Sequence, residues 1–274
     1  MADWGQHAAD YRVTSGVCFL TPNATAHTKS SWVTMTGGAP TRCEGFYLTS
    51  AWLGTQTTAR TILFDVGAGA GPTPIISNLM VCPTHVSTSS MTRVVSESIF
   101  FPVALPPAES INLRAQASMA SHSECVVLGT PMYSGLPCAG SIVDTYGADT
   151  ANTKGTTLTA STTEGVFGAW EVVSASCERI KALMIAVGHG QQDWSAFGDQ
   201  WSQIQIGIGA GGSEIEVARI PEIGTGSGFR IPSQSWLGPF YLDIPAGSRL
   251  SARVAKQHSS ASQRTIDVIL YGIR

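Results

Sequence analysis

Three glycines come nearest to a known chemical motif, because Gly207, Gly209 and Gly212 have the G-x-G-x-x-G spacing of a dinucleotide-binding turn. Such a turn follows a strand and opens a helix, since the free N–H groups at the helix N-terminus hold the pyrophosphate. Here residues 214–217 follow, and their polar–apolar alternation has the period of a strand. We therefore expect a tight connection between two strands and no bound cofactor.

Residue types that bind metals or catalyse hydrolysis are present but scattered. The six histidines and six cysteines stand apart from one another, without C-x-x-C pairs, so the sequence predicts no metal site. No G-x-S-x-G nucleophile elbow occurs. Asp193 and Asp199 could form the carboxylate pair of a glycosidase, but any two of the 19 acidic residues could be nominated in this way. We expect no catalytic residues and no enzymatic activity.

Aromatic and polar side chains concentrate in residues 188–201, which are the best candidates for ligand binding. On a loop, such a mixture would suit a sugar, because aromatic rings stack on the sugar ring while amides and carboxylates bind its hydroxyls. The candidate ligand-binding residues are Gln192, Asp193, Trp194, Asp199 and Trp201. The alternative is that one or both tryptophans pack in the interior or at a subunit interface.

The chain contains an internal duplication of five sequence blocks in the same order. The matched blocks are residues 20–33 with 158–171, 39–49 with 174–186, 62–76 with 204–218, 101–117 with 240–256, and 124–129 with 267–272. This alignment places Trp32 on Trp170 and Arg114 on Arg253. Because the two tryptophans recur at the same place, we expect them to anchor the core of each copy. The repeat predicts two homologous domains, residues 1–140 and 141–274.

Composition and periodicity predict an all-β fold. Charged residues make up only 13% of the chain, against roughly 25% in typical globular proteins. Short alternating runs bounded by Gly, Pro or Ser are typical of strands in a sandwich, with about eight strands in each domain. Residues 177–188 could form a helix, but they align with a strand-like run, and we expect a strand. The predicted fold is two tandem homologous β-sandwiches of the jelly-roll kind.

Charge and hydropathy narrow the choice of partners. The net charge is −3 and Lys and Arg form no cluster, which argues against binding to nucleic acid. No apolar run approaches the roughly 20 residues that span a bilayer, so we expect no membrane insertion. With so few charged side chains, the surface suits contact with further copies of the chain, and we expect a homo-oligomer, with a trimer among the candidate symmetries.

Several phrases resemble those of virion structural proteins of tailed bacteriophages. They are DTYGADTANTKGTTLTAS, IGIGAGGSE, DIPAGSRLSARV and the terminal DVILYG, and the resemblance extends from about Leu20 to the end of the chain. It implies a non-enzymatic structural protein located in the virion, on the capsid surface or in the tail, in contact with other virion proteins. Residues 1–13 show no signal-peptide pattern, so we expect assembly in the host cytoplasm.

The alternative hypothesis comes from the aromatic segment. A carbohydrate- or receptor-binding module would use the residues near Trp194, with a glycan of the host surface as its partner. A virion protein could combine both functions.

Overall fold

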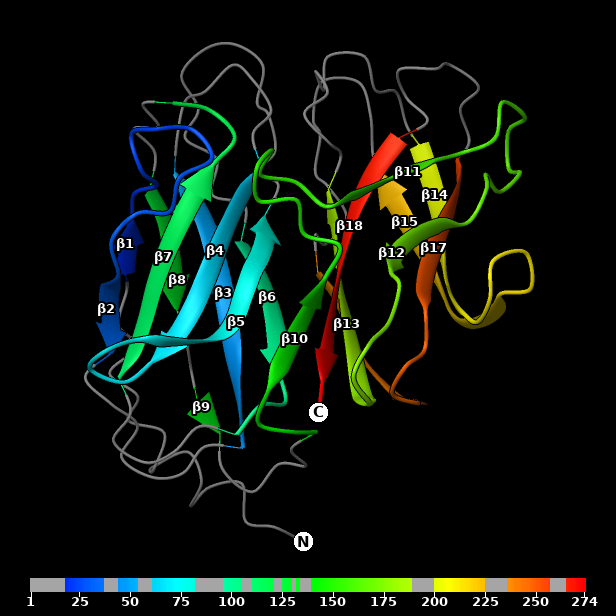
Figure 1. Ribbon diagram of the computed structural model, residues 1–274. Coiled ribbons are helices and arrows are strands. Elements are labelled where there is room, and N and C mark those ends of the chain that lie inside the picture. The colour runs from blue at the N-terminus through cyan, green and yellow to red at the C-terminus, as the bar shows by residue number, and fades with distance from the viewer. Residues whose placement is uncertain are drawn as a thin grey trace, which may run out of the picture.

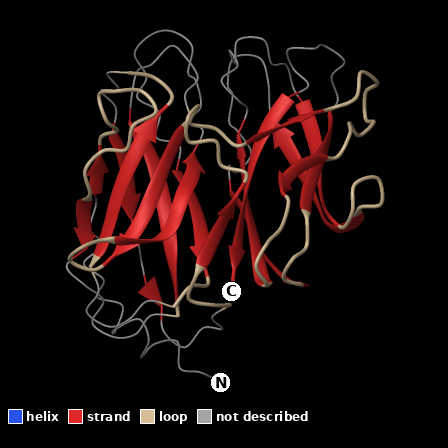
Figure 2. Cartoon of the chain, viewed as in Figure 1, coloured by secondary structure: helices blue, strands red, loops and turns tan. Residues whose placement is uncertain are grey.

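The computed structural model shows a protein built of β-strands (Figure 2). It describes residues 18–36, 44–53, 61–81, 96–104, 110–120, 125–129, 132–133, 139–188, 200–224, 236–256 and 265–274. All the regular secondary structure in these ranges is β-strand, and they contain no helix that could span a membrane.

The strands of the described residues form two sets, β1–β9 and β10–β18 (Figure 1). The first set is β1 (Cys18–Leu20), β2 (Val33–Thr36), β3 (Gly45–Leu53), β4 (Ile62–Ala68), β5 (Thr73–Val81), β6 (Ser96–Phe101), β7 (Ile111–Ala117), β8 (Cys125–Gly129) and β9 (Met132–Tyr133). The second set is β10 (Val143–Tyr146), β11 (Thr156–Thr159), β12 (Glu171–Ser174), β13 (Ile180–Gly188), β14 (Gln200–Ile208), β15 (Ile215–Gly224), β16 (Trp236–Ile244), β17 (Leu250–Lys256) and β18 (Thr265–Ile273).

Each set is a long antiparallel ribbon rolled into two sheets. In the first set β1 pairs with β8, β2 with β7, β3 with β6, and β4 with β5. In the second set β11 pairs with β18, β12 with β17, β13 with β16, and β14 with β15. The short strand β9 adds to β3, and β10 adds to β18 beside β11. This winding is that of a jelly roll, and the predicted fold of two β-sandwiches is confirmed.

The glycine run connects two antiparallel strands, as the sequence predicts. Ile208 at the end of β14 pairs with Ile215 at the start of β15. Between them Gly209 and Gly212 have φ angles of 113° and 84°, which glycine adopts without strain. The segment after the glycines is a strand and not a helix, which excludes a dinucleotide site of the Rossmann kind at this turn. Residues 180–188 form β13, so the expectation of a strand there is also confirmed.

The two sandwiches meet near residue 140. The first set of strands ends at Tyr133 and the second begins at Val143. Between them Gly140 forms a parallel bridge with Val103 of the first sandwich. Next to it, the N–H of Ser141 donates to the carbonyl of Arg274, at the end of the second. The connection is therefore held by both sandwiches.

One sheet of the second sandwich has two central strands, β13 and β18, that are buried on both faces. We call this sheet, formed by β10, β11, β18, β13 and β16, the junction sheet. In β13, Leu183 and Ile185 point into the core of the second sandwich, whereas Ala182, Met184 and Ala186 belong to the core of the first. The same alternation in β18 sends every second side chain to the first sandwich. The junction sheet is the middle layer of the molecule.

The junction sheet closes an edge of the first sandwich. Its strand β10 lies against β5 (Figure 1), β16 lies against β6, and β13 also contacts β5. β5 and β6 are the edge strands of the two sheets of the first sandwich. Without the junction sheet, the core between these two strands would be exposed to water. Covered in this way, the core side chains Ile76, Leu79 and Phe101 are 0–1% exposed.

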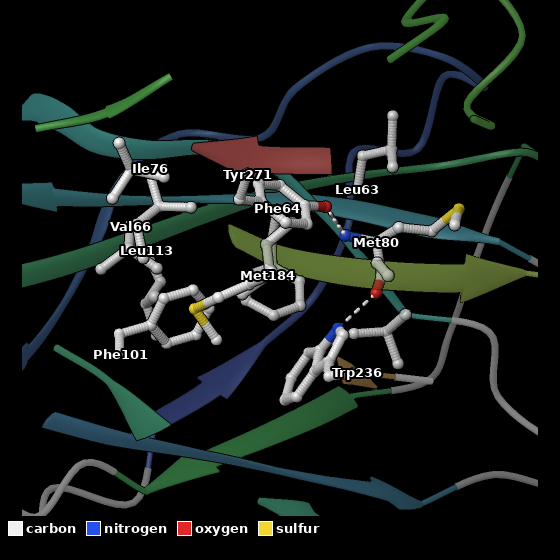
Figure 3. Packing of buried hydrophobic residues seen from close by; sticks show 14 of the residues in the cluster. Leu63, Phe64, Val66, Ile76, Met80, Phe101, Leu113, Met184, Trp236 and Tyr271 are labelled. Carbon is white, nitrogen blue, oxygen red and sulfur yellow. Dashed lines mark hydrogen bonds between the residues drawn. The ribbon is translucent and has the colours of Figure 1, made fainter. Parts of the chain in front are cut away.

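Two buried aromatic side chains of the junction sheet bind the backbone of β5 (Figure 3). The hydroxyl of Tyr271 accepts the N–H of Met80 at 3.0 Å and donates to the carbonyl of Asn78 at 2.9 Å. Nε1 of Trp236 donates to the carbonyl of Met80 at 2.6 Å. The Trp236 ring also meets Phe64 edge-on, with centroids 6.1 Å apart. The two sandwiches are therefore joined by specific hydrogen bonds as well as by apolar packing.

Because the sandwiches share a core, we predict a single cooperative transition when the protein unfolds in urea. Tyr271→Phe removes the partner of the buried N–H of Met80 and of the part-buried carbonyl of Asn78, and should lower the free energy of unfolding by about 1–3 kcal/mol. Tyr241→Phe is the matched control, because Tyr241 is 61% exposed. Two separate transitions of the wild-type chain would contradict a shared core.

Candidate functional site

The structure leaves the predicted sugar-binding segment largely outside the described residues. Gln192, Asp193, Trp194 and Asp199 are not among them. The backbone of Trp201 is described and belongs to β14, where it pairs with Ile223 of β15. Trp201 is therefore in a strand. The hypothesis of a glycan site near Trp194 stays a prediction.

Trp32 and Trp170 lie on the outer faces of their sheets, and the expectation that they anchor the cores is wrong. Both are half-buried. Trp32 stacks against Arg114 of β7, and Trp170 stacks against Arg253 of β17. The guanidinium carbon of Arg114 lies 4.5 Å from the centroid of the Trp32 ring, and that of Arg253 lies 4.3 Å from the Trp170 ring. The aligned tryptophans and arginines form one unit, present once in each sandwich.

A glycine completes this unit in both sandwiches. A Cβ built on Gly67 would lie 2.8 Å from Cη2 of Trp32, and one built on Gly207 would lie equally close to Cη2 of Trp170. The Trp32 ring therefore rests directly on the backbone of β4, and the Trp170 ring on that of β14, where only glycine leaves room. Since the tryptophans lie in the segments β1–β2 and β11–β12, the unit fixes the same crossover to the same sheet in each copy.

The unit matches Gly67 with Gly207, and both glycines lie in the matched blocks of residues 62–76 and 204–218.

In the first sandwich a buried carboxylate supports the arginine. Asp65 is 3% exposed and accepts hydrogen bonds from Nζ of Lys29 at 2.9 Å and Nε of Arg114 at 2.7 Å. It also accepts the N–H of Asn78 at 2.8 Å. Burial by itself would raise the pKa of Asp65, but the charge of Lys29 and these hydrogen bonds outweigh it and hold the pKa below its ordinary value. The carboxylate is ionised and fully engaged in the fold.

In the second sandwich an amide takes the place of the carboxylate, and a network extends across the sheet. Gln205 accepts from Nε of Arg253 at 2.6 Å and donates to Glu216 at 2.7 Å. Glu216 in turn binds Arg219 through two hydrogen bonds of 2.7 and 2.6 Å. Arg253 also lies 4.9 Å from the ring of Phe167. The aromatic and charged groups on this outer face of the sheet therefore interact with one another.

Three further carboxylates of the described residues are held by arginines. Hydrogen bonds from Arg219, Arg249 and Arg179 lower the pKa values of their carboxylate partners, which are Glu216, Glu214 and Asp243. A general acid at neutral pH needs the opposite shift. No group of three or more His, Cys, Asp or Glu side chains that could hold a metal occurs within the described part of the chain.

The second sandwich has an edge that none of its described residues covers. We call the edge formed by β15 and β16 the open edge; it corresponds to β5 and β6 of the first sandwich. Its apolar side chains pack on the core but are only partly buried: Val217 and Ala218 on β15, and Leu237, Phe240 and Leu242 on β16. Next to them Ile215 is 68% exposed. The open edge is therefore a candidate contact surface, and sequence analysis did not anticipate it.

The sequence matches no family model and no curated protein. Among solved structures it is similar to PNGF-II, with a TM-score of 0.43 and 10% identity over 94% of this chain and 64% of that chain. The chain thus spans less than two thirds of PNGF-II. It is also similar to the N-terminal CBM22-1-CBM22-2 tandem domain of Xyn10C from Paenibacillus barcinonensis, with a TM-score of 0.25 and 8% identity over 96% of this chain and 99% of that one. Similarities this low carry no argument about function.

The tight contact of the tryptophans with glycine gives a test of the repeated unit. Gly207→Ala would force the Trp170 ring off the strand and should lower the free energy of unfolding by about 1–3 kcal/mol, as overpacking does. Gly71→Ala is the control, since no atom lies within 4 Å of a Cβ built there. Urea unfolding of both variants measures the difference. Equal effects would show that the ring does not depend on this glycine.

The buried carboxylate predicts how stability depends on pH. Since the folded pKa of Asp65 lies below the unfolded value of about 3.9, its contribution is fully present above that pH and is lost as pH falls through the folded pKa. Asp65→Asn should lower stability at neutral pH by about 3 kcal/mol, because Lys29 loses its counter-charge. It should also flatten the loss of stability on acidification.

Asp243→Asn is the matched control for this titration, because Asp243 pairs with Arg179 on the surface, where both side chains are more than 60% exposed. Such pairs contribute little to stability. If Asp65→Asn and the wild type lose stability equally between neutral and acid pH, Asp65 is not the titrating group.

Proposed function

We propose that this chain is a non-enzymatic structural component of a tailed-phage virion, which assembles with copies of itself and with other virion proteins. The observation that carries the proposal is the open edge, where partly buried apolar side chains of the core line one side of the molecule. That the assembly is a tailed-phage virion is inferred from the resemblance of the sequence to virion structural proteins. A place on the capsid surface or in the tail follows from that resemblance alone.

The construction of the molecule supports a mechanical role. The two sandwiches are joined by one continuous apolar cluster, and the hydrogen bonds of Tyr271 and Trp236 fix their relative position. A double sandwich joined in this way would hold a fixed geometry between its neighbours. The carboxylates with shifted pKa values are held by basic partners, which supports structure and not proton transfer.

Glycan binding remains the alternative from the sequence. Four of the residues that carry it, Gln192, Asp193, Trp194 and Asp199, lie outside the described part of the chain, so it stays a prediction. The two hypotheses differ in their dependence on Trp194, because glycan binding would require this side chain and assembly would not.

Protein mass spectrometry of purified native particles tests the virion role. We expect peptides of this chain at a fixed ratio to the major structural proteins, retained through density-gradient purification and a high-salt wash. Peptides recovered only from the lysate, and never from the particles, would contradict the proposal.

A further inference from the structure

We propose that the open edge docks onto a second copy of this chain, by a repeat of the contact that joins the two sandwiches within one copy. The inference rests on the proposed function as an oligomeric structural protein, and it names the surface and the partner through which copies assemble.

The contact between the junction sheet and the first sandwich shows how an edge of this kind is covered. The edge strands β5 and β6 of the first sandwich are covered by β10, β13 and β16 of the junction sheet. As a result Ile76, Leu79 and Phe101 are removed from water. Met184 and Tyr271, on the covering face, belong to the same apolar cluster. The first sandwich is thus closed at this edge by a neighbouring sheet.

Among the described residues, the second sandwich repeats the edge without an equivalent cover, although β16 also lies against β6 of the first sandwich. By strand pairing β15 corresponds to β5 and β16 to β6. The core-facing Phe240, Leu237 and Val217 are only partly buried at this place. Apolar side chains that pack on the core and still meet water mark a surface that gains from being covered. The two edge strands add backbone groups that a neighbouring chain could engage.

A second copy is the partner that the duplication indicates. Within the chain, the covering element is the sheet with the order β10–β18–β13–β16, of which β18, β13 and β16 have counterparts in the first sandwich. Its counterpart in the first sandwich has the order β8–β3–β6. A second copy of the chain therefore brings to the open edge the sheet that is homologous to the natural cover. Such a contact is head-to-tail, so repeating it closes a ring or extends a filament.

Charge substitutions on the open edge test the proposal by light scattering coupled to size exclusion. Ile215→Glu changes a side chain that is 68% exposed, so the fold should tolerate it, and Val217→Glu places a charge deeper in the same edge. Val172→Glu is the matched control, because Val172 is 48% exposed on β12, the opposite edge strand of the same sheet. We expect the wild type and Val172→Glu to be oligomers and Ile215→Glu to be a monomer with an unchanged melting temperature.

Hydrogen exchange of the wild-type chain gives a second test that needs no variant. Backbone amides of β15 should become protected as the protein concentration rises from the monomeric to the oligomeric range, while those of β12 should not change. An oligomer that keeps its mass in Ile215→Glu and Val217→Glu, with β15 unprotected, would overturn the docking surface and leave the proposed function standing. A wild-type monomer at every concentration would overturn both.

Discussion

The structure depends on the burial of the junction sheet between two apolar layers. Its central strands β13 and β18 carry apolar side chains on both faces, one set for each sandwich. A sheet of this kind cannot face water on either side, because all of its apolar area would then be exposed. The position of the first sandwich, the closure of its edge and the hydrogen bonds of Tyr271 and Trp236 all follow from this constraint.

The duplication gave two copies of one ribbon, and the copies diverged where their surroundings differ. The Trp–Arg–Gly unit is common to both, because each copy must fix the same crossover to the same sheet. Around it the first sandwich has a buried ion pair of Asp65 with Lys29, and the second has the exposed network of Glu216 and Arg219. At the edges the difference is larger, since within the described residues only the edge of the first sandwich is covered by another sheet.

Sequence reasoning predicted the strands and the fold well, because alternation and turn glycines are local signals. The strand after Gly212 and the strand at residues 180–188 are examples. It placed Trp32 and Trp170 in the core, since a repeated tryptophan looks alike whether it packs inside or lies on an outer face. The open edge could not be predicted, because the burial of Phe240 depends on which sheet faces it and not on its neighbours in the sequence.

The most direct test of this account is a cryo-electron microscopy map of the purified oligomer. The account predicts that the β8–β3–β6 sheet of one copy covers β15 and β16 of the next, in the way that the junction sheet covers β5 and β6 within a chain. An oligomer in which β15 and β16 face solvent, with copies joined through another surface, would contradict it.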